Sequence, residues 1–325
     1  MSNLLDRSSI ILTPTAYDNS EVLCVKPSDG SFDFSRATEA TRINSLGLVE
    51  VVADNLPRIN YEGGCGSWLF EPQSTNLYLN SETLSTQTIT TTANQYSVSF
   101  YGTGTITFSG THTGSLIGTG LNDRVTATFS ATAGTLTSTV SGTVTKAQIE
   151  QLSFATSYIP TTTTSVTRNQ DLCTNGGNVA TISSTSGVLY AEIASLTQDD
   201  TFRLIGLNDG STQNRVNITY NNQTNELIFS CRVNNVNEFF FTKTLANTTT
   251  FHKCALLYKL NEFKVFINGV QENTQLSGST FAANTLDTLD FDIGNGGFPF
   301  FGKTKCLAVW KEALTDTELQ ELTTI

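Results

Sequence analysis

Apolar and polar residues alternate with a period of two along most of the chain after residue 83. The segment QYSVSFYGTGTITFSGTH, for example, places Tyr96, Val98 and Phe100 on one face of an extended backbone and resumes the pattern after a Gly-Thr-Gly turn. Successive side chains of a β-strand point to opposite faces, so this period is typical of strands with one buried face. The pattern predicts an all-β protein.

The distribution of charge divides the chain into three zones. Residues 1–82 carry eleven acidic and five basic residues, whereas residues 83–145 have only Asp123 and Arg124 as charged side chains. The remainder of the chain mixes charged, polar and aromatic residues. These shifts predict an N-terminal region over residues 1–82, a small Thr-rich sandwich with a linker over residues 83–167, and a larger domain over residues 168–325.

The middle zone is dense in Thr, Ser and Gly, but it keeps the alternation of a folded sheet. Its second half, DRVTATFSATAGTLTSTVSGTVTKAQIEQLSF, repeats the pattern of short strands between Gly turns. The β-branched side chain of Thr suits a pleated, half-exposed surface. We therefore predict a small antiparallel β-sandwich here and not a disordered linker.

The last zone shows the same period with larger side chains. Turn sequences such as NDGSTQN, NNQTN and NGGFPFFG separate its strands, and no helical pattern intervenes between them. Many short, evenly spaced strands favour an antiparallel sandwich of two sheets. The nine predicted strands are GVLYAEI, FRLIGL, RVNITY, ELIFSC, NEFFFTK, HKCALLY, EFKVFING, LDFDIG and KCLAVWK.

A single helix is predicted at the C-terminal end, in LTDTELQEL. Thr315 can cap the helix, and Glu318 follows three residues later at the spacing of a capping box. Leu319 and Leu322 then lie on one face of that helix.

Two segments of the last zone carry a resemblance to a known superfamily. HKCALLYKLNEFKVFINGVQ (residues 252–271) looks like a strand, turn, strand and Asn-Gly hairpin, and FFGKTKCLAVWKEALTDTELQEL (residues 300–322) looks like a closing strand that runs through Trp310 into a helix. In this order they resemble the concanavalin A-like, laminin-G-type lectin superfamily. The resemblance implies a two-sheet sandwich, and it does not imply a ligand, because this fold hosts lectins, adhesion modules and glycosidases.

The N-terminal sequence carries a second resemblance. LLDRSSIILTPTAYDNSEVLCVKPSDGSFDFSRATEATRINSLGLVEVVADNLPRINYEGG and then WLFEPQSTNLYLNSE (residues 68–82) are similar to a leader of bacteriophage structural proteins, especially fibre- and appendage-like ones. The sandwich and the linker AQIEQLSFATSYIPTTTTSVTRNQDLC (residues 147–173) resemble the segments that often follow this leader. The resemblance implies a virion protein, a head or tail fibre or a decoration subunit, assembled in the cytoplasm of a bacterial host.

The leader has few long apolar runs, and Pro and Gly interrupt it, so it is poorly able to build a core of its own. It is expected to lie extended across another surface or around sister chains. Arg36, Arg42 and Arg58 are the candidate docking residues, because a guanidinium binds a carboxylate in a bidentate way. The alternative, that they are solvated surface groups, stays open. As fibres need closed cyclic symmetry, the expected partners are other capsid or tail proteins and two further copies of the chain in a homotrimer.

Charge and cysteine content exclude several other classes of protein. A net charge of −11 and a pI of about 4.6 are opposite to the basic footprint that nucleic acid binding requires. No apolar run approaches a membrane span, and the first one is too short for a signal peptide. The six cysteines contain no CxxC pair and are accompanied by only two histidines, which disfavours zinc and predicts buried free thiols.

The sequence offers no catalytic set, and we predict that the protein is not an enzyme. Glycosidases need two carboxylates on either side of a sugar, and the E-x-D-x-x-E strand of the laminarinase-like relatives is absent. Neither histidine is accompanied by a G-x-S-x-G elbow. Asp290 and Asp292, in DTLDFDIGN, suit solvation or calcium, the one candidate cofactor, better than acid–base chemistry.

Host surface glycans are the predicted ligand of the lectin-like domain. Sugars stack on exposed aromatic rings, and amides fix their hydroxyl groups. Alternation in NEFFFTK would bury Phe239 and Phe241 and expose Phe240, or the reverse. The loop NGGFPFFG offers Asn295, Phe298 and Phe300. Two alternatives remain: a carbohydrate-active hydrolase on the same fold, and a capsid ornament without a ligand, which burial of both loop phenylalanines would favour.

Overall fold

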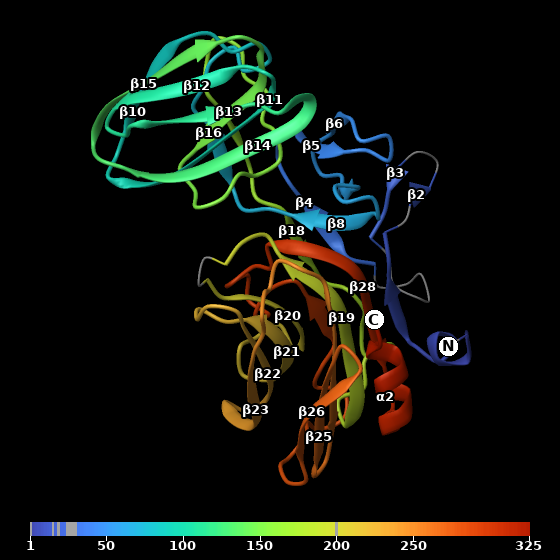
Figure 1. The fold of residues 1–325 in the computed structure, drawn as a ribbon. Helices are drawn as coiled ribbons and strands as arrows, with labels where there is room; N and C mark the ends of the chain where they lie inside the picture. Colours follow the sequence, from blue (N-terminus) through green and yellow to red (C-terminus); the bar gives the residue numbers. More distant parts are fainter. Residues whose placement is uncertain (1, 15, 18–19, 24–30, 199–200) are drawn as a thin grey trace.

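The computed structural model of the protein describes residues 2–14, 16–17, 20–23, 31–198 and 201–325. Over these residues the chain forms strands joined by turns and loops, with one short helix near each end, α1 (Ser2–Asp6) and α2 (Asp316–Thr323). Figure 1 shows a smaller part in cyan and green and a larger part that contains both termini. The predicted all-β fold class is confirmed.

One layer of the larger part is a five-stranded antiparallel sheet, which lies to the left of β19 and β28 in Figure 1. Strands that follow one another along the chain pair with each other from β20 to β23, and β27 pairs with the free edge of β20. In order across the sheet, the strands are β23 (Val236–Thr244), β22 (Glu226–Val233), β21 (Arg215–Tyr220), β20 (Arg203–Asn208) and β27 (Thr288–Asp290).

The other layer is an eight-stranded antiparallel sheet to which both ends of the chain contribute. Its C-terminal strand, β28, pairs with β19 along one edge and with β1 and β8 along the other. The strands are β26 (Val270–Gln275), β25 (Glu262–Ile267), β24 (His252–Lys259), β19 (Ser186–Ser195), β28 (Gly302–Trp310), β8 (Ser67–Phe70), β7 (Ile59–Asn60) and β1 (Ile10–Leu12).

The main hydrophobic core lies between these two sheets. The inward residues of each strand alternate with outward ones, as the sequence pattern predicts, and the buried set includes Leu189, Phe229 and Leu256. Seven residues of the N-terminal region belong to the same core: Ile10, Leu12, Leu23, Phe32, Ile59, Trp68 and Phe70. The region expected to lie across another surface therefore packs on the C-terminal domain of its own chain.

The outer face of the eight-stranded sheet is covered by the two helices. Leu319 and Leu322 of α2 and Leu4 of α1 pack against Trp310, whose indole nitrogen donates a hydrogen bond to the Leu4 carbonyl oxygen at 2.9 Å. Thr315 caps α2 and forms the capping box with Glu318, so the predicted C-terminal helix is confirmed in its cap and in its buried face.

The smaller part is an antiparallel sandwich with a separate core. Its buried residues include Tyr96, Phe100, Leu136 and Ile149. One sheet consists of β10 (Gln87–Thr91), β15 (Gly134–Ser141), β12 (Thr105–Gly110) and β13 (Gly114–Ile117). The other consists of β14 (Gly120–Ala131), β11 (Asn94–Gly102) and β16 (Val144–Glu150).

Four two-stranded ladders complete the fold, and two of them join the N-terminal region to later parts of the chain. These two are β4 (Asp33–Ser35) with β18 (Leu172–Thr174), and β9 (Ser74–Asn76) with β17 (Val166–Arg168). The other two are local hairpins, β2 (Ala16–Tyr17) with β3 (Ser20–Glu21) and β5 (Ala40–Ile43) with β6 (Val49–Val52).

All nine strands predicted in the last zone are present, and the structure adds the short strand β18 and the edge strand β26. Strand β26, in VQENTQ, was not predicted, because it is an edge strand with few apolar residues. Strand β27 ends at Asp290, and the predicted remainder of LDFDIG turns away from the sheet. None of the helices in the described ranges is long and apolar enough to cross a membrane.

The five cysteines that the structure describes are free thiols. Cys173, Cys231 and Cys254 are buried as predicted, and Cys306 is partly buried. Cys65 is exposed, in the Gly-rich turn before β8, so the prediction of burial is wrong for it. Cys24 lies outside the described residues.

Three arginines and two carboxylates form a fully buried cluster where the N-terminal region meets the rest of the chain; we call it the arginine–carboxylate cluster. Asp171 pairs with Arg36 at 3.0 Å and with Arg58 at 2.5 Å, and Glu71 pairs with Arg58 at 2.8 Å and with Arg168 at 3.5 Å. The side chains of Arg36 and Arg58 are 0% exposed. Both were predicted to dock a partner, and this prediction is wrong, because each binds carboxylates of its own chain.

Glu71 also receives hydrogen bonds from the backbone N–H and the hydroxyl of Ser157, at 2.7 and 2.6 Å. Burial alone would raise the pKa of this carboxyl, but the charges of Arg168 and Arg58 and the bonds from Ser157 outweigh burial and lower the pKa to about 2. Because Ser157 belongs to the segment after the small sandwich, the cluster joins all three zones of the chain.

Candidate functional site

The outward face of the five-stranded sheet carries a groove of about 220 Å³, which we call the aromatic groove. Alternation places its residues there, since their neighbours along each strand point into the main core. The lining residues are Phe202, Leu204, Arg215, Asn217, Thr219, Ile228, Ser230, Phe240, Ile293 and Phe298.

Two of the predicted glycan-binding residues meet in this groove. Phe240 comes from the middle of β23 and is 56% exposed, while Phe298 comes from the loop before β28 and is 50% exposed. Phe239 and Phe241, on either side of Phe240 in the sequence, pack with the core. This is the predicted alternation that exposes Phe240. The structure thus brings together two exposed rings that lie 58 residues apart in the sequence.

The backbone of Phe298 is held in a conformation that is rare for an aromatic residue. Its φ of 52° lies in the left-handed region, where the Cβ atom of a bulky residue crowds the following carbonyl group. The ring packs edge-on against Phe202 with centroids 5.4 Å apart. Backbone strain of this kind is concentrated at functional sites, and here it holds an apolar ring at the rim of a groove.

Polar side chains line part of the aromatic groove. The Asn217 amide donates to the Thr219 hydroxyl at 2.6 Å, and the Ser230 hydroxyl donates to the Asn217 amide oxygen at 2.9 Å. These polar residues were not predicted, because the aromatic runs alone indicated a glycan site in the sequence. The signal was present in RVNITY and ELIFSC, where polar residues occupy the positions that alternate with the core.

The other two predicted ligand-binding residues lie outside the groove. Phe300 is 2% exposed and packs in the main core against Phe70, Phe291 and Tyr220, so the prediction that it faces a ligand is wrong. Asn295 is exposed, and its amide oxygen accepts a hydrogen bond from the backbone N–H of Gly297 at 3.1 Å. Asn295 shapes the loop that presents Phe298.

The predicted calcium ligands are buried and bonded to their own chain. Asp290 accepts hydrogen bonds from the Asn208 amide at 2.8 Å and from the Asn175 backbone at 2.7 Å, and burial is the main cause of its raised pKa. Asp292 accepts two backbone N–H groups of the turn that follows it. The described residues hold no group of three or more His, Cys, Asp or Glu side chains suited to a metal ion.

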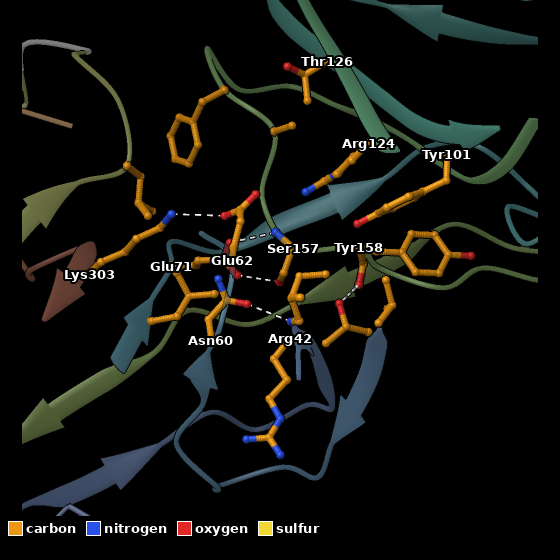
Figure 2. Close-up of a pocket in the computed structure, with 17 residues that line it drawn as sticks. Arg42, Asn60, Glu62, Glu71, Tyr101, Arg124, Thr126, Ser157, Tyr158 and Lys303 are labelled. Atoms are coloured by element: carbon orange, nitrogen blue, oxygen red, sulfur yellow. Dashed lines mark hydrogen bonds and ion pairs between the residues drawn. The ribbon is translucent and has the colours of Figure 1, made fainter. Parts of the chain in front are cut away.

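A second pocket, of about 320 Å³, lies where the small sandwich, the N-terminal region and β28 meet (Figure 2). In Figure 2, Arg124 and Tyr101 of the small sandwich approach from one side, and Glu62 and Lys303 lie together on another. Lys303 pairs with Glu62 at 3.1 Å. The pocket combines residues from all three zones, so no local sequence pattern could have revealed it.

The third predicted docking residue, Arg42, lies at the edge of this pocket. Its side chain is 18% exposed and pairs with Glu50 at 3.0 Å and with Glu21. The charged groups of the pocket are thus largely matched within the chain, as expected of a junction between domains. The aromatic groove, with its exposed rings, is the stronger candidate for a ligand site.

Comparison with known proteins identifies the fold of the larger part. The profile of the concanavalin A-like lectin/glucanases superfamily matches residues 167–320. No curated protein sequence matches the chain significantly.

Three solved structures illustrate the similarity. An intramolecular trans-sialidase from leech is 18% identical over 44% of this chain and 24% of its own, with a TM-score of 0.36. The CBM40 of a Ruminococcus gnavus sialidase, bound to α2,3 sialyllactose, is 18% identical over 43% of this chain and 83% of its own, with a TM-score of 0.36. Domain 4 of an arabinanase from Geobacillus stearothermophilus, in complex with arabinotriose, is 11% identical over 48% of this chain and 73% of its own, with a TM-score of 0.39.

At TM-scores below 0.5 these similarities do not identify a ligand. The match also spans only about a quarter of the leech enzyme. The family match covers the strands of the five-stranded sheet and most of the eight-stranded sheet. The part of the chain that bears the aromatic groove matches the concanavalin A-like lectin/glucanases superfamily and has a concanavalin A-like sandwich fold.

Proposed function

We propose that the protein binds glycans in the aromatic groove. The observation that carries this proposal is the pair of exposed rings, Phe240 and Phe298, in one groove together with amide and hydroxyl side chains. Such rings stack on the apolar faces of sugars, and the amide and hydroxyl groups offer partners for the hydroxyl groups of a sugar. The concanavalin A-like fold of the domain is consistent with this role.

Binding, and not hydrolysis, is the activity that the groove supports. Hydrolysis of a glycosidic bond needs two carboxyl groups about 5–10 Å apart. The residues that line the aromatic groove, within the described part of the chain, include no Asp or Glu. We therefore expect no reducing sugar to be released from any polysaccharide that the protein binds.

Replacing Phe240 or Phe298 with Ala should weaken glycan binding about tenfold each, because a stacked ring contributes about 0.5–1.5 kcal/mol beyond its buried area. Isothermal titration with oligosaccharides selected on an array of bacterial surface polysaccharides measures this change. Leu276→Ala is the matched control, since Leu276 is 73% exposed and is not one of the residues that line the groove. Unchanged dissociation constants in the F240A/F298A double variant would refute the proposal.

We further propose that this glycan-binding domain is displayed on a bacteriophage particle, as a fibre or decoration subunit that assembles as a homotrimer. The support is the resemblance of the first 173 residues to the leader, sandwich and linker of phage structural proteins. Several weak glycan contacts on one assembly would add up to firm adhesion to the host. Exposed positions on the hairpin β5–β6, such as Leu46 and Val51, offer apolar surface for assembly.

Gold-labelled antibody against the chain, applied to purified virions, tests this location. Gold on the capsid identifies a head fibre or decoration, and gold on the tail identifies a receptor-binding subunit. Light scattering of the purified protein gives the number of copies. Unlabelled particles together with a monomeric protein would contradict the virion proposal and leave glycan binding as a separate question.

A further inference from the structure

Two arginines stand side by side at one end of the aromatic groove. Arg215 lines the groove, and Arg232 occupies the position directly opposite it in the register between β21 and β22. Like charges at directly opposed positions destabilise a sheet. An arrangement of this kind therefore has a cost in the free protein that an anionic ligand would remove.

Neither guanidinium has a carboxylate partner in the described part of the chain. Among the described residues, the Arg215 side chain donates its one hydrogen bond to a neutral acceptor, the Thr212 carbonyl oxygen. The Nε atoms of Arg215 and Arg232 are both buried without a hydrogen-bond partner. Burial, and then the charge of Arg232, lower the pKa of Arg215, as expected for a cation without a counter-ion.

The buried guanidinium groups of the arginine–carboxylate cluster are paired with carboxylates, in contrast to those of Arg215 and Arg232. There, Arg36 and Arg58 each contact at least one carboxylate within 3.0 Å. Other basic side chains on the larger part are also paired, for example Lys243 with Glu272 at 2.6 Å. Arg124 of the small sandwich, like Arg215, binds only neutral acceptors in the described ranges. The pair Arg215 and Arg232 differs from Arg124 in that two such guanidinium groups are neighbours, and Arg215 lines the groove where the proposed ligand would lie.

We infer that the aromatic groove selects acidic sugars, with Arg215 and Arg232 binding the anionic group of the ligand. A guanidinium offers a planar fork of N–H donors that fits the two oxygens of a carboxylate, and also those of a sulfate. The exposed rings would stack on the sugar, while the two guanidinium groups would bind its anionic group. This inference rests on the proposed function, since it names the class of glycan that the groove takes.

Matched ligands test the inference with the full chain. The probes are trigalacturonate and its methyl ester, sialyllactose and lactose, and sulfated lactose. We expect at least one acidic probe to bind while its neutral counterpart does not. The R215Q/R232Q double variant should bind that probe about 10- to 100-fold more weakly, because hydrogen bonds to charged groups are the strong ones. Comparing the dissociation constants of the carboxylated and the sulfated probes shows which anion the arginines prefer.

The outcomes separate this inference from the proposed function. Equal binding of acidic and neutral probes, unchanged by R215Q/R232Q but weakened by F240A, would overturn the selection of acidic sugars and keep the groove as a glycan site. Failure of all probes and of all arrayed glycans would overturn both. Lys243→Gln is the control for loss of a positive charge on the same sheet, and it should leave binding unchanged.

Stability provides a readout that distinguishes a ligand-binding pair from a structural one. If the arginines await an anionic ligand, R232Q relieves repulsion, and the melting temperature of the free protein should stay the same or rise. An acidic probe should then raise the melting temperature of the unmodified protein and not that of R215Q/R232Q. A lower melting temperature in R232Q with unchanged binding would make the pair structural.

Discussion

Replacing Asp171 with Asn is expected to lower the free energy of unfolding by about 3–5 kcal/mol. The carboxylate of Asp171 binds Arg36 and Arg58 and also accepts the backbone N–H of Glu71 at 2.7 Å. An amide keeps the shape of the side chain but removes one of the two negative charges from a cluster that holds three buried arginines. Urea denaturation followed by tryptophan fluorescence measures the change, because Trp68 and Trp310 are both fully buried.

Glu312→Gln is the matched control for this prediction. Glu312 pairs with Arg7 at 2.7 Å, but the two side chains are 54% and 37% exposed, and exposed ion pairs contribute about 1 kcal/mol or less. If D171N and E312Q lowered the free energy of unfolding by similar amounts, the buried cluster would contribute no more to stability than an exposed ion pair.

Acid should act on the same cluster through Glu71. The pKa of this carboxyl is lowered from 4.5 to about 2 in the folded chain, so its contribution to stability is fully present above pH 4.5 and is lost as the pH falls towards 2. The difference in unfolding free energy between the unmodified protein and E71Q should therefore shrink between pH 5 and pH 3. A difference that stays constant over this range would contradict the assignment.

A fragment of residues 168–325 is expected not to fold, although it contains nearly all of the sequence that matches the lectin superfamily. Without the N-terminal region, β28 loses β1 and β8 along one edge, and the main core loses seven side chains, Trp68 and Phe70 among them. Removal of a single large aromatic residue from a core costs about 3–5 kcal/mol, and a whole domain is stable by only about 5–15 kcal/mol.

The small sandwich offers the contrasting fragment. Residues 74–165 contain both of its sheets and its separate core, so this fragment should unfold cooperatively on its own. Circular dichroism on heating, applied to the two fragments, checks the pair of expectations. A cooperative transition in the 168–325 fragment would show that the N-terminal region is an addition to the lectin-like domain and not a part of it.

Sequence patterns predicted local structure well and long-range placement poorly. Alternation found nine strands of the larger part, and the spacing of Thr315 and Glu318 found the C-terminal helix. The pairing of β1 with β28 was not predictable, because nothing in residues 10–12 specifies a partner about 300 residues away. The docking role assigned to Arg36 and Arg58 failed for the same reason, since their carboxylate partners come from distant parts of the chain.

The candidate site was predicted in part. Phe240 was distinguished from its neighbours by strand alternation, and Phe298 by its position in a loop. Phe300, only two residues from Phe298, was misjudged, because a loop sequence does not show where the chain re-enters the core. The arginine pair could not be predicted from the sequence. Its recognition depends on the register between β21 and β22 and on the absence of nearby carboxylates in the described residues.

The position of β28 also determines when the molecule can be completed during synthesis. Ile10 pairs with Val309, so β1 leaves the ribosome about 300 residues before the strand with which it pairs. At about 5–20 residues per second, this delay amounts to about 15–60 s. Until then the apolar side chains of the N-terminal region and the open edges of its strands remain uncovered. Long-range closure of this kind makes folding slow, and a nascent chain in this state depends on protection from aggregation.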